Sequence, residues 1–340
     1  MENFASYDTK NNDRTNRLDP LDAFRVIALL IVFIHHAHIE GVPYIAGGVG
    51  VRFFFAISGY QIGKGFKNGR YTPASFLKKR FIHVGIPYLI CVIFITLFYS
   101  YMIEDDPLTI LRMFTFTHTA YVFMGHLWFV SAIMQLYLMA MVVGYVINRV
   151  RNNVNVCRIF FVALIIGGCV MRIMYSHTGI DLYFTSYGSL DIFFCAFLLP
   201  FINVKKVKIS SIIKGIALTT FCIFLLITLL WIYEEVDNTL LIESTLLMSL
   251  MFLYIFDDNI RRSNEPLTLQ AIKGNWWRIV ECLSLISFGF YMWHAIVVKK
   301  FGFIKPYPVF LLASFAISIL IAVIWYYSVE KMTERMYTKL

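Results

Sequence analysis

Ten long apolar segments are the feature that most constrains the fold of this 340-residue chain. A helix that spans a bilayer needs about 20 mostly apolar residues. Segments that meet this requirement lie at residues 21–39, 45–62, 84–102, 126–147, 159–175, 187–202, 212–233, 240–256, 280–298 and 309–327. Charged residues make up only 15% of the chain, well below the roughly 25% of an ordinary soluble domain. The sequence therefore predicts an all-α integral membrane protein with about ten transmembrane helices.

The charges of the connecting loops predict how the helices are oriented. Basic residues gather in every second connection, at 64–80, 149–151, 205–208 and 261–262, whereas acidic residues gather at 104–106, 181 and 234–237. Because basic loops stay on the cytoplasmic side, both termini are expected in the cytoplasm. We expect residues 1–20 to form a polar N-terminal tail, 21–328 one transmembrane domain, and 329–340 a short C-terminal tail.

Three lysines break this charge pattern. The net charge of +9 is otherwise mostly explained by topology, so we expect no nucleic-acid partner. Lys299, Lys300 and Lys305, however, fall in a connection that the alternation places outside. Lysines near helix ends commonly extend to the membrane interface, which is the simplest interpretation. The alternatives are that the last two helices are placed differently, or that these lysines bind an acceptor or a lipid phosphate.

The first apolar segment carries ionisable residues that require an explanation. Arg25 and His36 are eleven residues apart, which puts them within about 20° around a helix and about 16.5 Å apart along its axis. The two side chains therefore share one helix face. His35 lies roughly 80° away from Arg25, so it is expected to point toward a neighbouring helix or lipid. Ionisable residues inside a membrane are candidates for function, although an arginine at a helix start also fits a side chain that extends to the interface.

Four stretches give the chain a resemblance to a known family. They are DAFRVIALLIVFIHH, GGVGVRFFFAISGY, HLWFVSAIMQLYL and SFGFYMWHAIVV, which begin at Asp22, Gly47, His126 and Ser287. In type and order they resemble the motifs of the membrane acyltransferase 3 family, over residues from about 20 to 330. The resemblance implies about ten transmembrane helices in the bacterial inner membrane. It also implies an enzyme that moves an acetyl group from cytoplasmic acetyl-CoA to a glycan hydroxyl, on a surface polysaccharide or its lipid-linked precursor (O-antigen, capsule or exopolysaccharide).

The same resemblance implies roles for single residues. His36 corresponds to the catalytic histidine of the family and Arg25 to its essential arginine. The Arg-x-x-Arg pair found in many members appears here as Arg80 followed by His83, so only the first position carries a permanent charge. Arg52 stands where many members have an acidic or neutral residue.

Acetyl transfer from a thioester to an alcohol needs a base for the hydroxyl proton and donors for the developing oxyanion. We expect His36 to be the general base; alternatively, His36 or a nearby hydroxyl carries the acetyl group covalently. The phosphates of acetyl-CoA are expected among Arg25, Arg80, Lys78 and Lys79, because arginine and lysine are natural phosphate partners. Lys78 and Lys79 equally fit ordinary topology signals.

The acceptor is expected to contact His126, Trp128, His294 and Asp191. Trp128 also fits an aromatic belt at the membrane interface. Asp191 is expected to face an arginine or the cavity, since an unpaired carboxylate inside a membrane is costly. Ser58 and Gly59 fit close helix packing somewhat better than catalysis. Glu330 resembles a family glutamate, but we expect it to be solvated on a cytoplasmic tail.

Other function classes are compatible with parts of the sequence. A secondary transporter would use Arg25 and His36 as substrate and proton sites, yet the chain has no inverted repeat with paired broken helices. A membrane sensor, or the membrane half of a two-domain enzyme, is a third hypothesis. We expect no metal, because the six cysteines lack the paired spacing of a metal site. Self-association into a homo-oligomer, and succinyl in place of acetyl, are left open.

Overall fold

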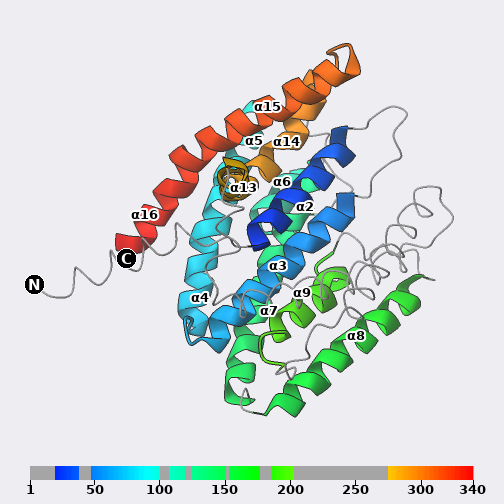
Figure 1. Ribbon diagram of the computed structural model, residues 1–340, viewed down its shortest axis with the longest axis vertical. Coiled ribbons are helices and arrows are strands. Elements are labelled where there is room, and N and C mark those ends of the chain that lie inside the picture. The colour runs from blue at the N-terminus through cyan, green and yellow to red at the C-terminus, as the bar shows by residue number, and fades with distance from the viewer. Residues whose placement is uncertain are drawn as a thin grey trace, which may run out of the picture.

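The computed structural model describes residues 20–37, 47–99, 107–118, 124–150, 153–176, 185–202 and 275–339. Every regular element in these ranges is a helix (Figure 1). The longer helices are α2 (Pro20–Ala37), α3 (Gly47–Lys67), α5 (Ile86–Tyr99), α7 (Trp128–Val150), α8 (Val154–Ser176), α13 (Asn275–Leu285), α14 (Ser287–Phe301) and α15 (Tyr307–Trp325). The shorter ones are α4 (Pro73–Arg80), η1 (Phe81–Gly85), α6 (Pro107–Phe114), η3 (Gly125–Leu127), η4 (Tyr187–Ser189), α9 (Leu190–Leu198), η5 (Tyr326–Glu330) and α16 (Lys331–Lys339).

The helices agree with a membrane protein. Among the described residues, four continuous helices are long and apolar enough to span a bilayer: Pro73–Phe98, Gly125–Val150, Val154–Tyr175 and Tyr307–Met336. The segment Arg278–Leu285 and α14 form a fifth span if they are counted together, with a bend of 71° between them. Described helices overlap eight of the ten predicted segments, and the segments at 212–233 and 240–256 lie outside the described residues. Ten spans and cytoplasmic termini stay predictions.

Two helices extend further than the hydropathy pattern predicted. The span predicted from residue 84 begins at Pro73, because Thr72 and Ser75 form a capping box in which each side chain accepts the other's backbone N–H. Proline in the first turn suits a helix start, and the basic residues Lys78–Arg80 therefore lie on the helix. At the other end, the last helix continues through η5 and α16, so the predicted tail is helical.

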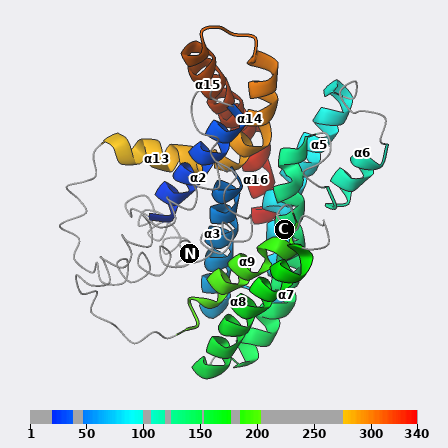
Figure 2. The ribbon, with the colours of Figure 1, turned by 90° about the vertical axis from the view of Figure 1, so that its right-hand side faces the viewer.

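Helix α3 lies at the centre of the described helices and packs closely on α2 and α9. Figure 1 shows α15 and α16 along one edge of the molecule and α8 along the other, with α2 and α3 between them. Figure 2 shows α14 beside α15 and α7 beside α8. A Cβ atom on Gly59 or Gly63 would lie 2.1 or 2.0 Å from the carbonyl oxygen of Phe193 or Phe197 on α9. Glycine at both positions is therefore what allows the two backbones to approach.

Buried ionic groups fasten α9 to its neighbours. Arg52 is 1% exposed, and its Nη1 donates to the carbonyl of Gly188 and to Ser189 Oγ, both at 3.1 Å. Arg172 on α8 forms a buried ion pair with Asp191 on α9. Each buried guanidinium thereby has hydrogen-bond acceptors away from water, which offsets part of the cost of its burial. Arg52, whose role the sequence did not indicate, holds α3 to the start of α9.

Candidate active site

Arg25 is held in a polar network near the start of α2. Its Nη1 donates to Asp22 Oδ1 at 2.9 Å, and its Nη2 donates to Gln61 Oε1 on α3 at 2.6 Å. Ser284 on α13 also donates to Asp22 Oδ1, at 2.7 Å. These bonds join three helices around one guanidinium and fix its direction. Asp22 supplies the counter-charge, which offsets the cost of placing an arginine within a membrane helix.

Arg25 lines a cavity of about 220 Å³ together with Arg80, His83 and Glu330. The guanidinium of Arg80 lies over the rings of Phe76 and Tyr137, 5.7 and 5.3 Å from their centroids. Stacking on an aromatic face is favourable for arginine. It leaves the N–H groups at the edge of the guanidinium plane available for hydrogen bonds. The cavity therefore brings together two arginines that are distant in the sequence, which suits an anionic ligand. We call it the arginine cavity.

Glu330 corrects a prediction. We expected Glu330 to be solvated on a cytoplasmic tail. It lines the arginine cavity instead, because η5 continues the last helix beyond Trp325 and Glu330 is part of that helix. A Cβ atom on Gly289 would lie 3.2 Å from its Oε1, so the carboxyl group packs against α14. His83, the residue in place of the second family arginine, lines the same cavity.

Three histidines from three elements meet near the other end of α2. His36 Nδ1 lies 3.3 Å from His294 Nε2 on α14. The ring centroid of His126 is 6.1 Å from that of His36 and 5.6 Å from that of His294. His35, by contrast, packs on α3, where a Cβ on Gly47 would lie 2.6 Å from its ring. The predicted difference in direction between His35 and His36 is confirmed.

The hydrogen bonds of this cluster determine which nitrogens carry protons. His294 Nδ1 lies 2.7 Å from the carbonyl of Tyr291, and a carbonyl only accepts, so Nδ1 of His294 carries the hydrogen. Nε2 of neutral His294 is then an acceptor. His36 Nδ1 lies 2.9 Å from the carbonyl of Val32 and faces that acceptor, so it also carries a hydrogen. The lone pair of neutral His36 is consequently on Nε2, as a general base requires.

His126 has the opposite tautomer. Its Nε2 lies 3.1 Å from the carbonyl of Met292, so Nε2 carries the hydrogen and Nδ1 keeps the lone pair. The hydroxyl of Tyr291 donates to the backbone carbonyl of His126. These two bonds tie η3 to α14 across the site.

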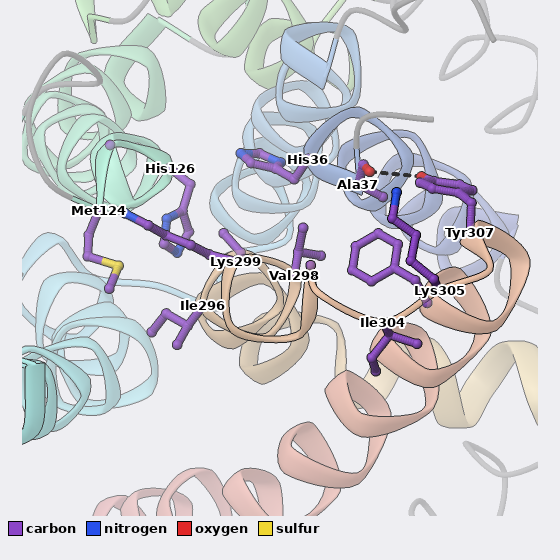
Figure 3. Close-up of a pocket in the computed structure, with 14 residues that line it drawn as sticks. His36, Ala37, Met124, His126, Ile296, Val298, Lys299, Ile304, Lys305 and Tyr307 are labelled. Atoms are coloured by element: carbon purple, nitrogen blue, oxygen red, sulfur yellow. Dashed lines mark hydrogen bonds between the residues drawn. The ribbon is translucent and has the colours of Figure 1, made fainter. Parts of the chain in front are cut away.

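His36 and His126 line a second and larger cavity of about 620 Å³ (Figure 3). Lys299, Lys305 and Tyr307 line it as well, and the hydroxyl of Tyr307 donates to the carbonyl of Ala37 at 2.8 Å. We call it the histidine cavity. No described residue lines both cavities.

An aromatic layer lies between the two cavities. Phe54, Phe129 and Tyr291 line the arginine cavity and contact one another, with ring centroids 5.1 to 6.3 Å apart. The ring of Tyr291 also lies 6.2 Å from that of His126, which lines the histidine cavity. The ring of Tyr291 therefore lies between the arginine cavity and His126.

The remaining predicted site residues lie elsewhere. Trp128 is buried with its ring 6.0 Å from that of Phe55, and it lines neither cavity. Asp191 faces Arg172, and an arginine was one of its two expected surroundings. The other, a cavity, is not what it faces. Lys78 is exposed and Lys79 lies 6.0 Å from the ring centroid of Tyr71, so neither joins Arg25 and Arg80.

The sequence reasoning missed Gln61 and Ser284. An amide in an apolar segment such as the one around Gln61 was the available signal, because a buried polar group needs a partner. The hydroxyl of Ser284 carried no such signal, since serine commonly packs in a helix without a functional partner. Tyr291 lies in the family-like stretch that begins at Ser287, but the sequence did not indicate its contact with His126.

Comparison with known proteins places the chain in a family. No curated protein and no solved structure matches the chain. Residues 19–327, however, match the acyltransferase domain of the acyltransferase 3 family. This range contains Arg25, Arg80 and the three histidines. The chain is therefore a membrane acyltransferase that belongs to the acyltransferase 3 family.

Proposed function

We propose that the protein transfers an acetyl group from cytoplasmic acetyl-CoA to a hydroxyl of a glycan, on a surface polysaccharide or its lipid-linked precursor. One observation carries this proposal. A histidine with its lone pair on Nε2 lies at the histidine cavity, and an arginine-lined cavity lies on the other side of the aromatic layer. This arrangement supplies a base, a space for the acceptor and a cationic site for the donor.

In the proposed reaction the acceptor hydroxyl attacks the thioester carbonyl carbon while His36 Nε2 takes the hydroxyl proton. The tetrahedral intermediate then collapses, its carbon–sulfur bond breaks, and CoA leaves with the proton from His36. A positioned general base typically contributes 10²- to 10⁴-fold to such a step. The Nδ1–H of His36 donates to Val32 and His294, which stabilises the imidazolium that forms. Formation of an acetyl intermediate on His36 is the covalent alternative.

Arg25 and Arg80 are proposed to bind the phosphates of acetyl-CoA. Arginine is well suited to phosphate because its planar fork donates two parallel hydrogen bonds. Arg25 and His36 are about 16.5 Å apart along α2, a distance comparable to an extended pantetheine arm. The arm passes the layer of Phe54, Phe129 and Tyr291 only when those side chains move.

The proposal includes the cellular setting. We infer a multi-pass protein of the bacterial inner membrane, with acetyl-CoA on the cytoplasmic side and a glycan or glycolipid acceptor on the other. Membrane lipids surround the apolar faces, such as that of α8, where Ile159, Ile166 and Ile173 are exposed. Two cavities on either side of a layer also fit the transporter hypothesis, which the experiment below tests.

The test compares wild type, His36→Ala and His35→Ala in a host that lacks its own copy, at matched membrane levels. O-acetyl groups released from the surface polysaccharide by mild alkali are measured, and the released acid is identified by mass. We expect His36→Ala to lose the acetyl groups and His35→Ala to keep them. Normal acetylation by both variants would remove His36 from the mechanism. No acyl group from wild type would favour the transporter or sensor hypothesis.

A further inference from the structure

The histidine cavity has an unusual set of polar side chains for a site that binds sugar hydroxyls. Among its described lining residues they are His36, His126, Lys299, Lys305 and Tyr307. Asp, Glu, Asn and Gln, whose oxygens accept bonds from neutral hydroxyls, do not occur among these lining residues. Among these described lining residues, the side chains that carry a permanent charge are two lysines.

The two lysines approach the cavity from different positions. Lys299 is in the last turn of α14, and Lys305 is in the turn before α15. In Figure 3, Lys299 points toward Met124 and His126, whereas Lys305 lies beside Tyr307 on the other side of His36. The proposed base and two cationic side chains thus line one cavity.

Extension to the membrane interface does not account for this placement by itself. A lysine that only seeks water can do so from any side of a helix end. Lys299, Lys300 and Lys305 are all exposed, but only Lys299 and Lys305 line the cavity. Two of the three lysines that depart from the charge pattern of the loops therefore line the cavity. Lys300, which does not, is a matched control for substitutions of the other two.

We propose that the acceptor is anionic, with a phosphate or carboxylate group near the hydroxyl that is acylated, and that Lys299 and Lys305 bind this group. The inference rests on the proposed function, because it names the substrate class of the same site. A lysine ammonium is a compact point charge with three donors, which suits either anion. The anion has two sources: a diphosphate that links the sugar to a lipid carrier, or a carboxylate on the sugar itself.

The experiment uses membranes from the organism that encodes the chain, with the native copy replaced by each variant. Membranes are incubated briefly with [¹⁴C]acetyl-CoA, and the labelled product is passed over an anion-exchange resin. Brief labelling captures the first product before any transfer from a lipid carrier. Mild acid, which cleaves a sugar diphosphate, then separates the sources: charge lost from the labelled sugar indicates phosphate, and charge retained indicates carboxylate.

The variants are Lys299→Gln, Lys305→Gln, the double variant, Lys300→Gln and Lys299→Arg. We expect the label on the anionic fraction, and an initial rate at limiting acceptor that falls about threefold to tenfold for each single Gln variant. Lys300→Gln should retain the wild-type rate, and Lys299→Arg, which keeps the positive charge, should recover part of the rate that Lys299→Gln loses. Raising the salt concentration should slow wild type more than the double variant, because salt screens exposed charges.

Two results would overturn the inference in distinguishable ways. Label on a neutral product, or equal rates for the double variant and Lys300→Gln, would refute an anionic acceptor while the acetyltransferase function stands. Absence of any labelled product from wild type would refute the proposed function, and the inference with it.

Discussion

His294 is expected to act through His36, and its replacement gives a magnitude that follows from the geometry. In the proposed reaction His36 becomes an imidazolium in the transition state, and its Nδ1–H faces His294 Nε2 at 3.3 Å and the carbonyl of Val32 at 2.9 Å. A hydrogen bond to a charged group is worth about 1.5–3 kcal/mol. The distance of 3.3 Å is at the long end of the range, so the lower part of that interval applies.

His294→Leu should therefore lower kcat about 10- to 30-fold, because 1.4 kcal/mol corresponds to about tenfold in rate. The much larger loss of kcat that a wrong tautomer of His36 would cause is not expected. The carbonyl of Val32 still accepts the Nδ1–H of His36 and so keeps the tautomer. The KM for acetyl-CoA should not change, because His294 lines neither cavity. His294→Gln, which restores an acceptor oxygen, should recover most of the rate.

The assay is the initial rate of [¹⁴C]acetyl transfer in purified membranes, with Tm measured in detergent as the control for folding. Leucine has a similar volume to the fully buried histidine, so the fold should persist. A His294→Leu protein with the wild-type kcat would refute the reasoning. A loss as deep as that of His36→Ala, without recovery by glutamine, would show instead that His294 contacts substrate directly.

Three further predictions test other parts of the structure. Arg80→Gln should raise the KM for acetyl-CoA about tenfold, and Lys78→Gln should leave it unchanged; equal effects would contradict the arginine cavity as donor site. Asp191→Asn leaves a buried guanidinium without its counter-charge, so unfolding in detergent should become easier by about 3–5 kcal/mol, and an unchanged Tm would contradict the buried pair. Gly63→Ala should destabilise by about 1–3 kcal/mol, whereas Gly167→Ala, where a Cβ meets nothing within 4 Å, should not.

Several features were predictable because they depend on short stretches of sequence. The apolar segments predicted helices, and described helices overlap eight of the ten. The spacing of Arg25 and His36 predicted a shared face, and the different direction predicted for His35, toward a neighbouring helix, is confirmed by its packing on Gly47. Helix ends were less predictable, since the Thr72 capping box starts one helix well before its apolar segment begins.

The site itself was only partly predictable. His126 and His294 were candidates for acceptor contacts, but the sequence did not indicate that His294 would touch His36. Trp128 and Asp191 were candidates of equal quality, and the structure places both in packing roles outside the cavities. An ionisable residue in an apolar segment indicates only that some partner exists, and both a substrate and a second helix satisfy that requirement.

The sequence alone determined that the chain is an all-helical membrane protein, and which helix face carries Arg25 and His36. Helix formation and the direction of side chains around one helix are local properties, so a single stretch of sequence contains them. Only the tertiary structure decided that His294, 258 residues from His36, is its neighbour, and that Arg80 joins Arg25. Those contacts depend on how closely helices pack, and the packing is determined by residues of several helices together, such as the glycines of α3 that allow α2 and α9 to approach.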